Sequence, residues 1–165
     1  ARELGVGDDV LAKGIGSFEG LPHRIEFVRE HEGVLYYNDS FSSAPAATVA
    51  AIRAFQQPEI VVIGGIDKGA DFSELASCLR DRTNIKEIVL IGEVRHALRD
   101  FFAAHQVPHT VTVSDAKTMT AVVEDARRQA TAGDIVLLSP GCASFDMFRD
   151  FYDRGDQFRE VVNAL

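Results

Sequence analysis

Three short, continuous apolar runs constrain the fold of this chain most strongly. They are EIVVIGG (59–65), EIVLIG (87–92) and DIVLLSP (134–140), and each ends in glycine or in serine and proline. Apolar runs of this length without polar alternation are typical of strands that are buried on both faces of a parallel sheet. Segments with helical periodicity separate them. The chain therefore alternates strand and helix from about residue 34 to its end.

The remaining elements follow from local periodicity and from turn residues. Apolar spacing predicts helices in the segments 8–18, 45–55, 71–80, 94–102, 118–130 and 145–162. Asp71, followed three residues later by Glu74, is expected to cap the helix that it begins. HTVTV (109–113) is predicted to be a short strand. Two further strands, on either side of the turn HEG (31–33), form a hairpin near the start of the chain.

This pattern predicts an α/β fold, Rossmann-like and doubly wound, with a mostly parallel sheet, helices on both faces and a short antiparallel edge. In such sheets, ligands bind beyond the carboxyl ends of the strands. Three turns occupy that position, each after a strand and before a helix. They are NDSFSSAP (38–45), GGIDKGADF (64–72) and SPGCASFD (139–146).

Composition excludes several classes of protein. The 165 residues fit one domain, and the hydrophobic share of 46% is sufficient for a core. The net charge of −8 argues against binding to nucleic acid or to an anionic membrane. No apolar run is long enough to span a bilayer. Cys78 and Cys142 lack metal-ligand spacing, so we expect no metal site and a reduced, cytoplasmic protein.

The turn GGIDKGADF carries the most specific chemistry. Gly64, Gly65 and Gly69 allow a ligand to approach the backbone, and the amides at the start of the following helix favour an anion. Lys68 adds a full positive charge beside those amides, which predicts a site for a carboxylate or phosphate. The alternative is a solvated lysine in a tight turn. The nucleotide pattern GxxxxGK[ST] is absent, so a triphosphate cradle is not expected here.

Other polar residues of these turns allow two interpretations each. Ser144 is a helix cap that could also contact an anion, or only a cap. Asp39 could accept hydrogen bonds from a ribose, or could stabilise a turn or cap a helix. Arg24 could stack on a base or bind phosphate, or could be an ordinary surface arginine.

Four segments together resemble one family in order and spacing. They are SFEGLPHRIEFV, GVLYYNDSF, GGIDKGADF and GDIVLLSPGCASFDMFRDFYDRGDQF, and the resemblance covers nearly the whole chain. They resemble the C-terminal part of the Mur ligases of peptidoglycan synthesis, specifically the branch that adds D-glutamate to UDP-N-acetylmuramoyl-L-alanine. The resemblance implies that residues 23–165 are the C-terminal, glutamate-binding domain. Residues 1–22 would then be the tail of a central ATP-binding domain.

The resemblance also implies roles for individual residues. Lys68 would hold the incoming glutamate, and the same amino acid would be contacted by Ser43, Ser144, Phe145 and Phe151. Arg24 and Asp39 would reach ATP, with Asp39 on the ribose.

The implied reaction begins when ATP phosphorylates the alanine carboxylate of the precursor. The glutamate amine then attacks the acyl phosphate. The phosphate loop, the modified lysine and most of the Mg²⁺ ligands would lie in the central domain. We expect no catalytic residue in this chain, which would act together with the N-terminal and central domains. We therefore expect this fragment alone to be inactive, and the complete protein to be a cytoplasmic monomer.

One departure from the family pattern leaves alternatives open. The family usually reads NDSKATN where this chain reads NDSFSSAP, so Phe41 replaces a lysine and a second carboxylate partner is lost. A sister branch that adds L-glutamate to the same acceptor is therefore an alternative. A different class, a non-catalytic Rossmann-like module that binds a nucleotide or an anionic metabolite, shares the fold. It gives no reason for the four segments to occur together.

Overall fold

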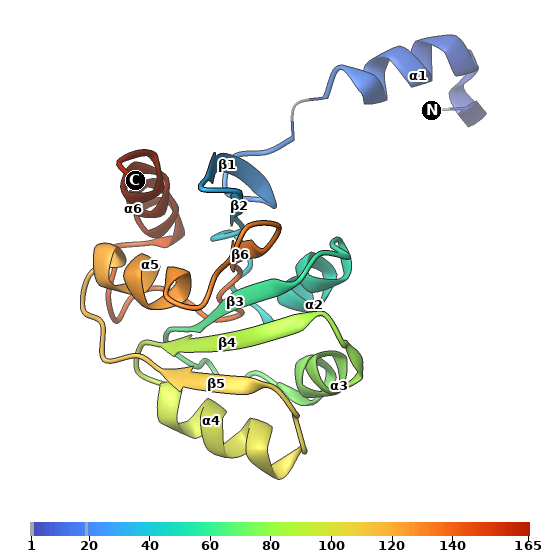
Figure 1. Ribbon diagram of the computed structural model, residues 1–165. Helices are drawn as coiled ribbons and strands as arrows, with labels where there is room; N and C mark the ends of the chain where they lie inside the picture. Colours follow the sequence, from blue (N-terminus) through green and yellow to red (C-terminus); the bar gives the residue numbers. More distant parts are fainter. Residues whose placement is uncertain (1, 19) are drawn as a thin grey trace.

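The computed structural model describes residues 2–18 and 20–165, and its centre is one mixed sheet (Figure 1). The strands of the described chain follow the order β1-β2-β6-β3-β4-β5. They are β1 (Glu26–His31), β2 (Val34–Asn38), β3 (Glu59–Gly64), β4 (Ile85–Ile91), β5 (Thr110–Val113) and β6 (Ile135–Leu138). Only the β1–β2 pairing is antiparallel, and the others are parallel. The predicted fold class is confirmed, including its antiparallel edge.

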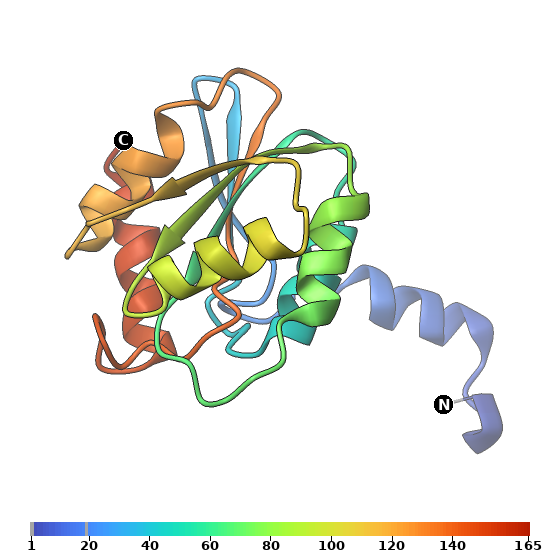
Figure 2. The ribbon, with the colours of Figure 1, turned by 90° about the horizontal axis from the view of Figure 1, so that it is seen from below.

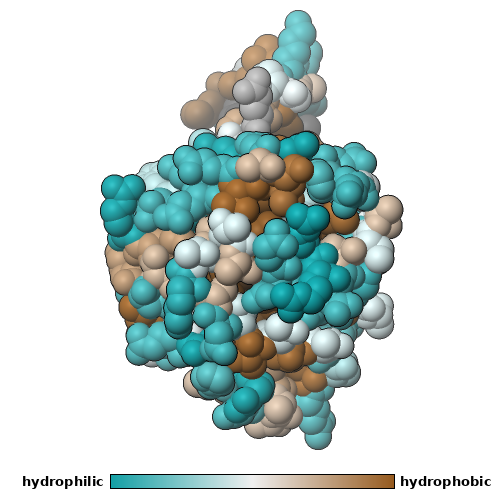
Figure 3. Space-filling view, turned by 60° about the vertical axis from the view of Figure 1, so that its left-hand side comes forward, coloured by the Kyte–Doolittle hydropathy of each residue, from teal (hydrophilic) through white to brown (hydrophobic). Residues whose placement is uncertain are grey.

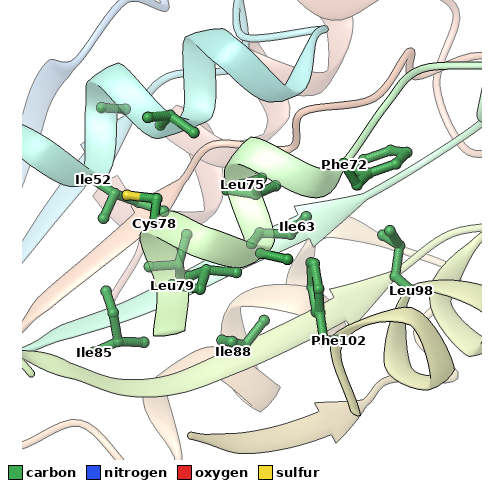
Figure 4. Close-up of a cluster of buried hydrophobic side chains, with 14 of the residues drawn as sticks. Ile52, Ile63, Phe72, Leu75, Cys78, Leu79, Ile85, Ile88, Leu98 and Phe102 are labelled. Carbon is green, nitrogen blue, oxygen red and sulfur yellow. The ribbon is translucent and has the colours of Figure 1, made fainter. Parts of the chain in front are cut away.

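Helices cover both faces of the sheet. Those that do are α2 (Pro45–Arg53), α3 (Ser73–Asp81), α4 (Arg95–Ala104), α5 (Met119–Arg127) and α6 (Phe151–Asn163). The helix α1 (Asp8–Gly16) and a short 3₁₀ helix η1 (Arg2–Leu4) precede them in the chain. One core cluster joins α2, α3 and α4 to one face, and Figure 4 shows part of it. A second cluster joins α5 and α6 to the opposite face.

The strand β3 shows why the sequence requires two covered faces. Successive side chains of a strand point to opposite sides. Val61 and Ile63 belong to the first cluster, whereas Ile60 and Val62 belong to the second. All four are 0% exposed. Fully burying each such side chain stabilises the fold by about 1.5–3 kcal/mol. An apolar run without alternation is therefore what a strand at this position needs.

The topology creates a crevice beside β6. The chain leaves β3 towards α3 on one face, and leaves the neighbouring β6 towards α6 on the other face. Ligands of doubly wound sheets bind where neighbouring connections diverge in this way. The strand β2 lies on the other side of β6 from β3, and it leads into the remaining one of the three turns. The three turns selected from the sequence thus meet at one end of the sheet.

The bounds of all six predicted helices differ from the structure by one residue or more, and two of the differences have a clear local cause. The closing helix begins at Phe151 rather than near residue 145, because Asp150 caps it by accepting a hydrogen bond from the amide of Asp153 (2.8 Å). The helix α3 begins at Ser73 with Phe72 as its N-cap residue, so the predicted capping by Asp71 is wrong. Asp71 instead accepts a hydrogen bond from the amide of Ser73 (2.8 Å), just outside the cap.

The N-terminal segment stands away from the sheet and its helices (Figures 1 and 2). The helix α1 contributes no buried residue. Leu4, Val10 and Ile15 are at least half exposed, and Figure 3 shows apolar side chains on the surface of this projecting segment. No helix in the described part of the chain is long and apolar enough to cross a membrane.

Candidate functional site

The three turns enclose a pocket of about 210 Å³ at the carboxyl end of the sheet. Its lining consists of Ser43, Lys68, Ala143, Ser144, Phe145 and Phe151. All five residues for which the sequence predicted contact with the amino acid are among them. They come from three separate turns and from the first residue of α6, so the fold alone brings them together.

Glycine is required where β3 turns towards Lys68. Gly65 has a φ of +143°, and a Cβ atom at this position would lie 2.1 Å from the carbonyl oxygen of Ala143. The backbone can therefore pass close to the turn after β6. The next residue, Ile66, donates a backbone hydrogen bond to the same oxygen of Ala143 (2.9 Å). This contact fixes the start of the Lys68 turn against the opposite wall of the pocket.

Lys68 lies at the exposed tip of that turn. The carboxylate of Asp67 accepts hydrogen bonds from the amides of Gly69 and Ala70, both at 2.9 Å, which closes the turn around Lys68. The ammonium nitrogen lies 5.0 Å from the centre of the Phe145 ring, within the range of a cation–π contact. Within the described residues, no ion pair engages this ammonium. It is therefore available to an anionic ligand.

The amides beside Lys68 do not have the role that the sequence predicted. We expected them, with the start of the following helix, to bind the anion. The amides of Gly69 and Ala70 are already bound to Asp67, and that of Ser73 is bound to Asp71. A second carboxylate would have to displace these contacts. The charge of Lys68, rather than the helix terminus, is the feature that selects an anion here.

The turn after β6 supplies the opposite wall. Ser144 is 2% exposed, and its carbonyl oxygen accepts hydrogen bonds from the amides of Met147 (3.2 Å) and Phe148 (2.9 Å). Ser144 therefore lies in a tight turn and does not cap the closing helix, contrary to the prediction. Phe145 is 58% exposed and presents its ring to Lys68.

Asp39 does not line this pocket. Its side chain is buried, with the whole residue 1% exposed. One carboxylate oxygen accepts a hydrogen bond from the amide of Ile25 (3.2 Å), and the other from the hydroxyls of Ser42 (2.5 Å) and Ser139 (2.7 Å). Burial raises the pKa of Asp39, and the serine hydrogen bonds oppose that shift. These hydrogen bonds are those of neither an Asx turn nor a helix cap, the alternatives to ribose binding that the sequence allowed, and the buried carboxylate is not exposed to a ribose.

Arg24 lines a neighbouring pocket of about 240 Å³. The other residues of that pocket are Leu21, Pro22, Phe41 and Tyr152. The guanidinium carbon of Arg24 lies 5.6 Å from the centre of the Phe41 ring. Phe41 in turn meets Phe151 edge to face, with ring centres 5.0 Å apart. Arg24 therefore lines a different pocket from Lys68, and the contact between Phe41 and Phe151 lies between the two pockets.

Sequence reasoning missed Arg154, which holds two of the turns together. Its side chain donates to the hydroxyl and the carbonyl of Ser40 (2.9 and 2.8 Å) and to the carbonyl of Cys142 (3.1 Å). Burial lowers the pKa of Arg154 to about 10, so the group remains charged at neutral pH. A signal was present, because Arg154 lies at helical spacing between Phe151 and Phe158 on an otherwise apolar stripe.

The described residues include no group of three or more His, Cys, Asp or Glu side chains that could hold a metal ion.

Comparison with known proteins assigns the chain to a family. A family profile described as "Mur ligase, glutamate ligase domain" matches residues 23–142. The chain belongs to the Mur ligase family. This Mur ligase domain is 40% identical over 161 residues to a UDP-N-acetylmuramoylalanine–D-glutamate ligase of a Thermoanaerobacter species. It is 43% identical over 165 residues to the protein of the same name from Syntrophus aciditrophicus.

The matches cover 98% and 100% of the Mur ligase domain, but it spans only 35% of the length of either relative. Among solved structures, it resembles the MurF ligase of Thermotoga maritima, which was solved in complex with ADP. The TM-score is 0.61 and the identity is 20%, with coverage of 99% of this chain and 36% of that one. At this identity the likeness concerns the fold alone.

Proposed function

We propose that the complete protein containing this chain is an ATP-dependent ligase that adds D-glutamate to UDP-N-acetylmuramoyl-L-alanine, and that this chain binds the incoming glutamate. The convergence of Ser43, Lys68, Ser144, Phe145 and Phe151 in one pocket is the observation that carries the proposal. The identities of 40% and 43% to ligases of that name favour it over a non-catalytic binding module.

The pocket would act by positioning. Lys68 would neutralise a carboxylate of glutamate, and Phe145 and Phe151 would form apolar walls beside the hydrocarbon chain. The amine, in its unprotonated form, would then attack an acyl phosphate formed from ATP and the alanine carboxylate with release of ADP, and its nitrogen would give up a proton to solvent. The resulting tetrahedral intermediate would lose phosphate and leave an amide. Holding the amine in the correct place is itself a large contribution to rate.

The rest of the machinery would belong to the part of the protein outside this chain. ATP, and the Mg²⁺ that accompanies its phosphates, would be held mainly by a central domain. Residues 1–22 would be the tail of that domain, which is consistent with an α1 that buries nothing against residues 23–165. Arg24, which lines the neighbouring pocket, would approach ATP, and Asp39, which accepts a hydrogen bond from the amide of Ile25, would hold the backbone beside Arg24. We expect a cytoplasmic monomer.

Phe41 makes the configuration of glutamate the point to test. The exposed ring lies against Phe151, so it borders the glutamate pocket where the family pattern has a lysine. With one cation fewer, the pocket has less to distinguish the two carboxylates of glutamate. An L-glutamate ligase acting on the same acceptor is therefore the second candidate.

The deciding experiment is an assay of the complete protein with ATP, the UDP-linked acceptor and either isomer of glutamate. ADP release and the mass of the amide product are measured. We expect product with D-glutamate, and no product from residues 1–165 alone. Product with L-glutamate only would establish the second candidate. Absence of product with both isomers, in a folded protein that binds ATP, would refute the proposal.

A further inference from the structure

Asp146 fastens the wall of the glutamate pocket to the end of β4. Its carboxylate accepts a hydrogen bond from the backbone amide of Glu93 (2.8 Å), 53 residues away in the chain. Glu93 follows β4, whereas Asp146 lies in the turn after β6, so the contact crosses over the end of β3. The attraction between Asp146 and the buried charge of Arg154 favours the same position. Nothing in the sequence interpretation gave Asp146 a role.

The surrounding backbone is shaped to admit this carboxylate. Gly92 has a φ of +74°, and a Cβ atom there would lie 2.3 Å from the Asp146 carboxylate and 2.7 Å from the Cα of Gly65. Glycine at position 92 therefore leaves the space that Asp146 occupies. The carboxylate oxygen that does not bind Glu93 is buried and has no hydrogen-bond partner among the described residues. A buried carboxylate oxygen without a hydrogen-bond partner costs free energy, which the hydrogen bond from Glu93 to the other oxygen only partly offsets.

Phe145, the residue before Asp146, depends on this contact for the position of its ring. Phe145 is 58% exposed, and its only ring contact in the described structure is with the ammonium of Lys68. The direction of the Phe145 ring therefore depends on the backbone of its own turn. Asp146 fixes that backbone immediately after Phe145.

We propose that Asp146 is a positioning residue for the glutamate pocket: by holding the 141–148 turn against Gly92 and Glu93, it places the Phe145 ring under Lys68 and so places the ammonium at the pocket. This proposal rests on the proposed function only in naming glutamate as the ligand. The geometric part can be tested without any ligation.

The geometric test uses the NMR signal of the Lys68 ε-methylene group in the complete protein labelled with ¹³C-lysine. Lys68→Arg assigns the signal, which the nearby Phe145 ring shifts upfield. Asp146→Ala removes the acceptor for Glu93 and is expected to return the signal towards that of a free lysine. Asp146→Asn keeps an acceptor oxygen and is expected to retain most of the shift. A signal that is unchanged in a folded Asp146→Ala variant would overturn the proposal.

The kinetic test compares Michaelis constants in the same variants. We expect Asp146→Ala to raise KM for glutamate about tenfold and KM for ATP less than about twofold, with Asp146→Asn close to wild type. In a Phe145→Ala background, Asp146→Ala should add almost nothing, because the two residues act through one contact. A full tenfold increase in that background, or an equal increase for ATP, would overturn the proposal.

Asp134→Ala is the matched control. Asp134 also accepts a backbone hydrogen bond, from Thr131 (2.7 Å), but at the opposite end of β6. Its loss should lower stability and leave both the Lys68 signal and the ratio of the two KM values unchanged. If the wild-type protein ligates neither isomer, the proposed function fails. The NMR comparison then still decides the role of Asp146.

Discussion

Arg154 and Ser40, which are 114 residues apart in the chain, are joined by two hydrogen bonds beneath the pocket. A third bond, to the carbonyl of Cys142, connects the same guanidinium to the turn after β6. One buried cation thus fastens the β2 turn, the β6 turn and α6 to one another. No carboxylate of the described residues forms an ion pair with Arg154. Its hydrogen bonds go to neutral oxygen atoms, and the nearby charges of Asp146 and Asp39 also favour the buried cation.

Replacing Arg154 should therefore be costly. Arg154→Gln leaves the two carbonyl oxygens largely without donors, and each unsatisfied buried group costs about 1–3 kcal/mol. We expect the free energy of unfolding in urea to fall by about 3 kcal/mol. Arg149→Ala, which removes an exposed arginine just before the same helix, is the control and should change it by less than about 0.5 kcal/mol. Equal losses in the two variants would contradict the account.

Two glycines of the Lys68 turn should respond very differently to alanine. At Gly65 a Cβ atom would meet the carbonyl oxygen of Ala143 at 2.1 Å, whereas at Gly69 nothing lies within 4 Å. Both have positive φ, +143° and +79°, so both variants carry backbone strain. We expect Gly69→Ala to lose about 1–2 kcal/mol of stability and Gly65→Ala to lose clearly more. Thermal unfolding of the two variants side by side measures the difference, and equal midpoints would show that the turns are not packed as described.

The buried Glu59, at the opposite end of the sheet from the pocket, should make the stability of the fold depend on pH. Its residue is 0% exposed, and burial raises its pKa from 4.5 to about 7, against the opposing effects of Asn84 and Arg82. The folded state therefore favours the protonated form more than the unfolded state does. The contribution of Glu59 to stability is therefore fully present below about pH 4.5 and is lost as the pH rises towards about 7.

Glu59→Gln removes that loss. Relative to the wild type, the free energy of unfolding of the variant should increase steadily between these two pH values, by up to about 3 kcal/mol above pH 7. Urea unfolding across the range measures the difference, with the exposed Glu160→Gln as control. Parallel curves for Glu59→Gln and wild type would show that Glu59 does not titrate in this range.

The architecture was predictable from sequence because few residue patterns satisfy it. The apolar runs at β3, β4 and β6 can only be accommodated in a sheet covered on both faces. One helix connects β3 to β4, whereas two helices and β5 lie between β4 and β6. The boundaries of α3 and α6 were missed for a local reason. Asp71 and Asp150 are both acidic residues before a helix, and only the backbone geometry decides that Asp150 caps and Asp71 does not.

Five of the six residues that line the pocket were named from the sequence, but the contacts that hold their turns together were not. Lys68 and Ser144 lie in turns that topology alone brings to one end of the sheet. The roles of the residues that hold these turns, Arg154 and Asp146, could not be predicted from the sequence. Both residues act through contacts with residues 114 and 53 positions away. The buried state of Asp39 likewise depends on Ser139, which is 100 positions away.

Phe41 should influence the glutamate pocket through Phe151. The edge-to-face contact of the two rings, with centres 5.0 Å apart, holds Phe151 at the pocket wall. Such contacts contribute about 0.5–1.5 kcal/mol beyond burial, so Phe41→Ala should raise KM for glutamate by several fold. Phe41→Tyr keeps the ring and should be close to wild type. If Phe41→Ala left KM unchanged, the ring would not support the pocket.

The central claim is that the ammonium of Lys68 holds the glutamate carboxylate. The most direct measurement is KM for glutamate and for ATP in Lys68→Ala of the complete protein. A hydrogen bond to a charged group is worth about 1.5–3 kcal/mol, so KM for glutamate should rise about tenfold to a hundredfold while KM for ATP changes little. Equal increases in both constants, or no increase for glutamate, would contradict the account.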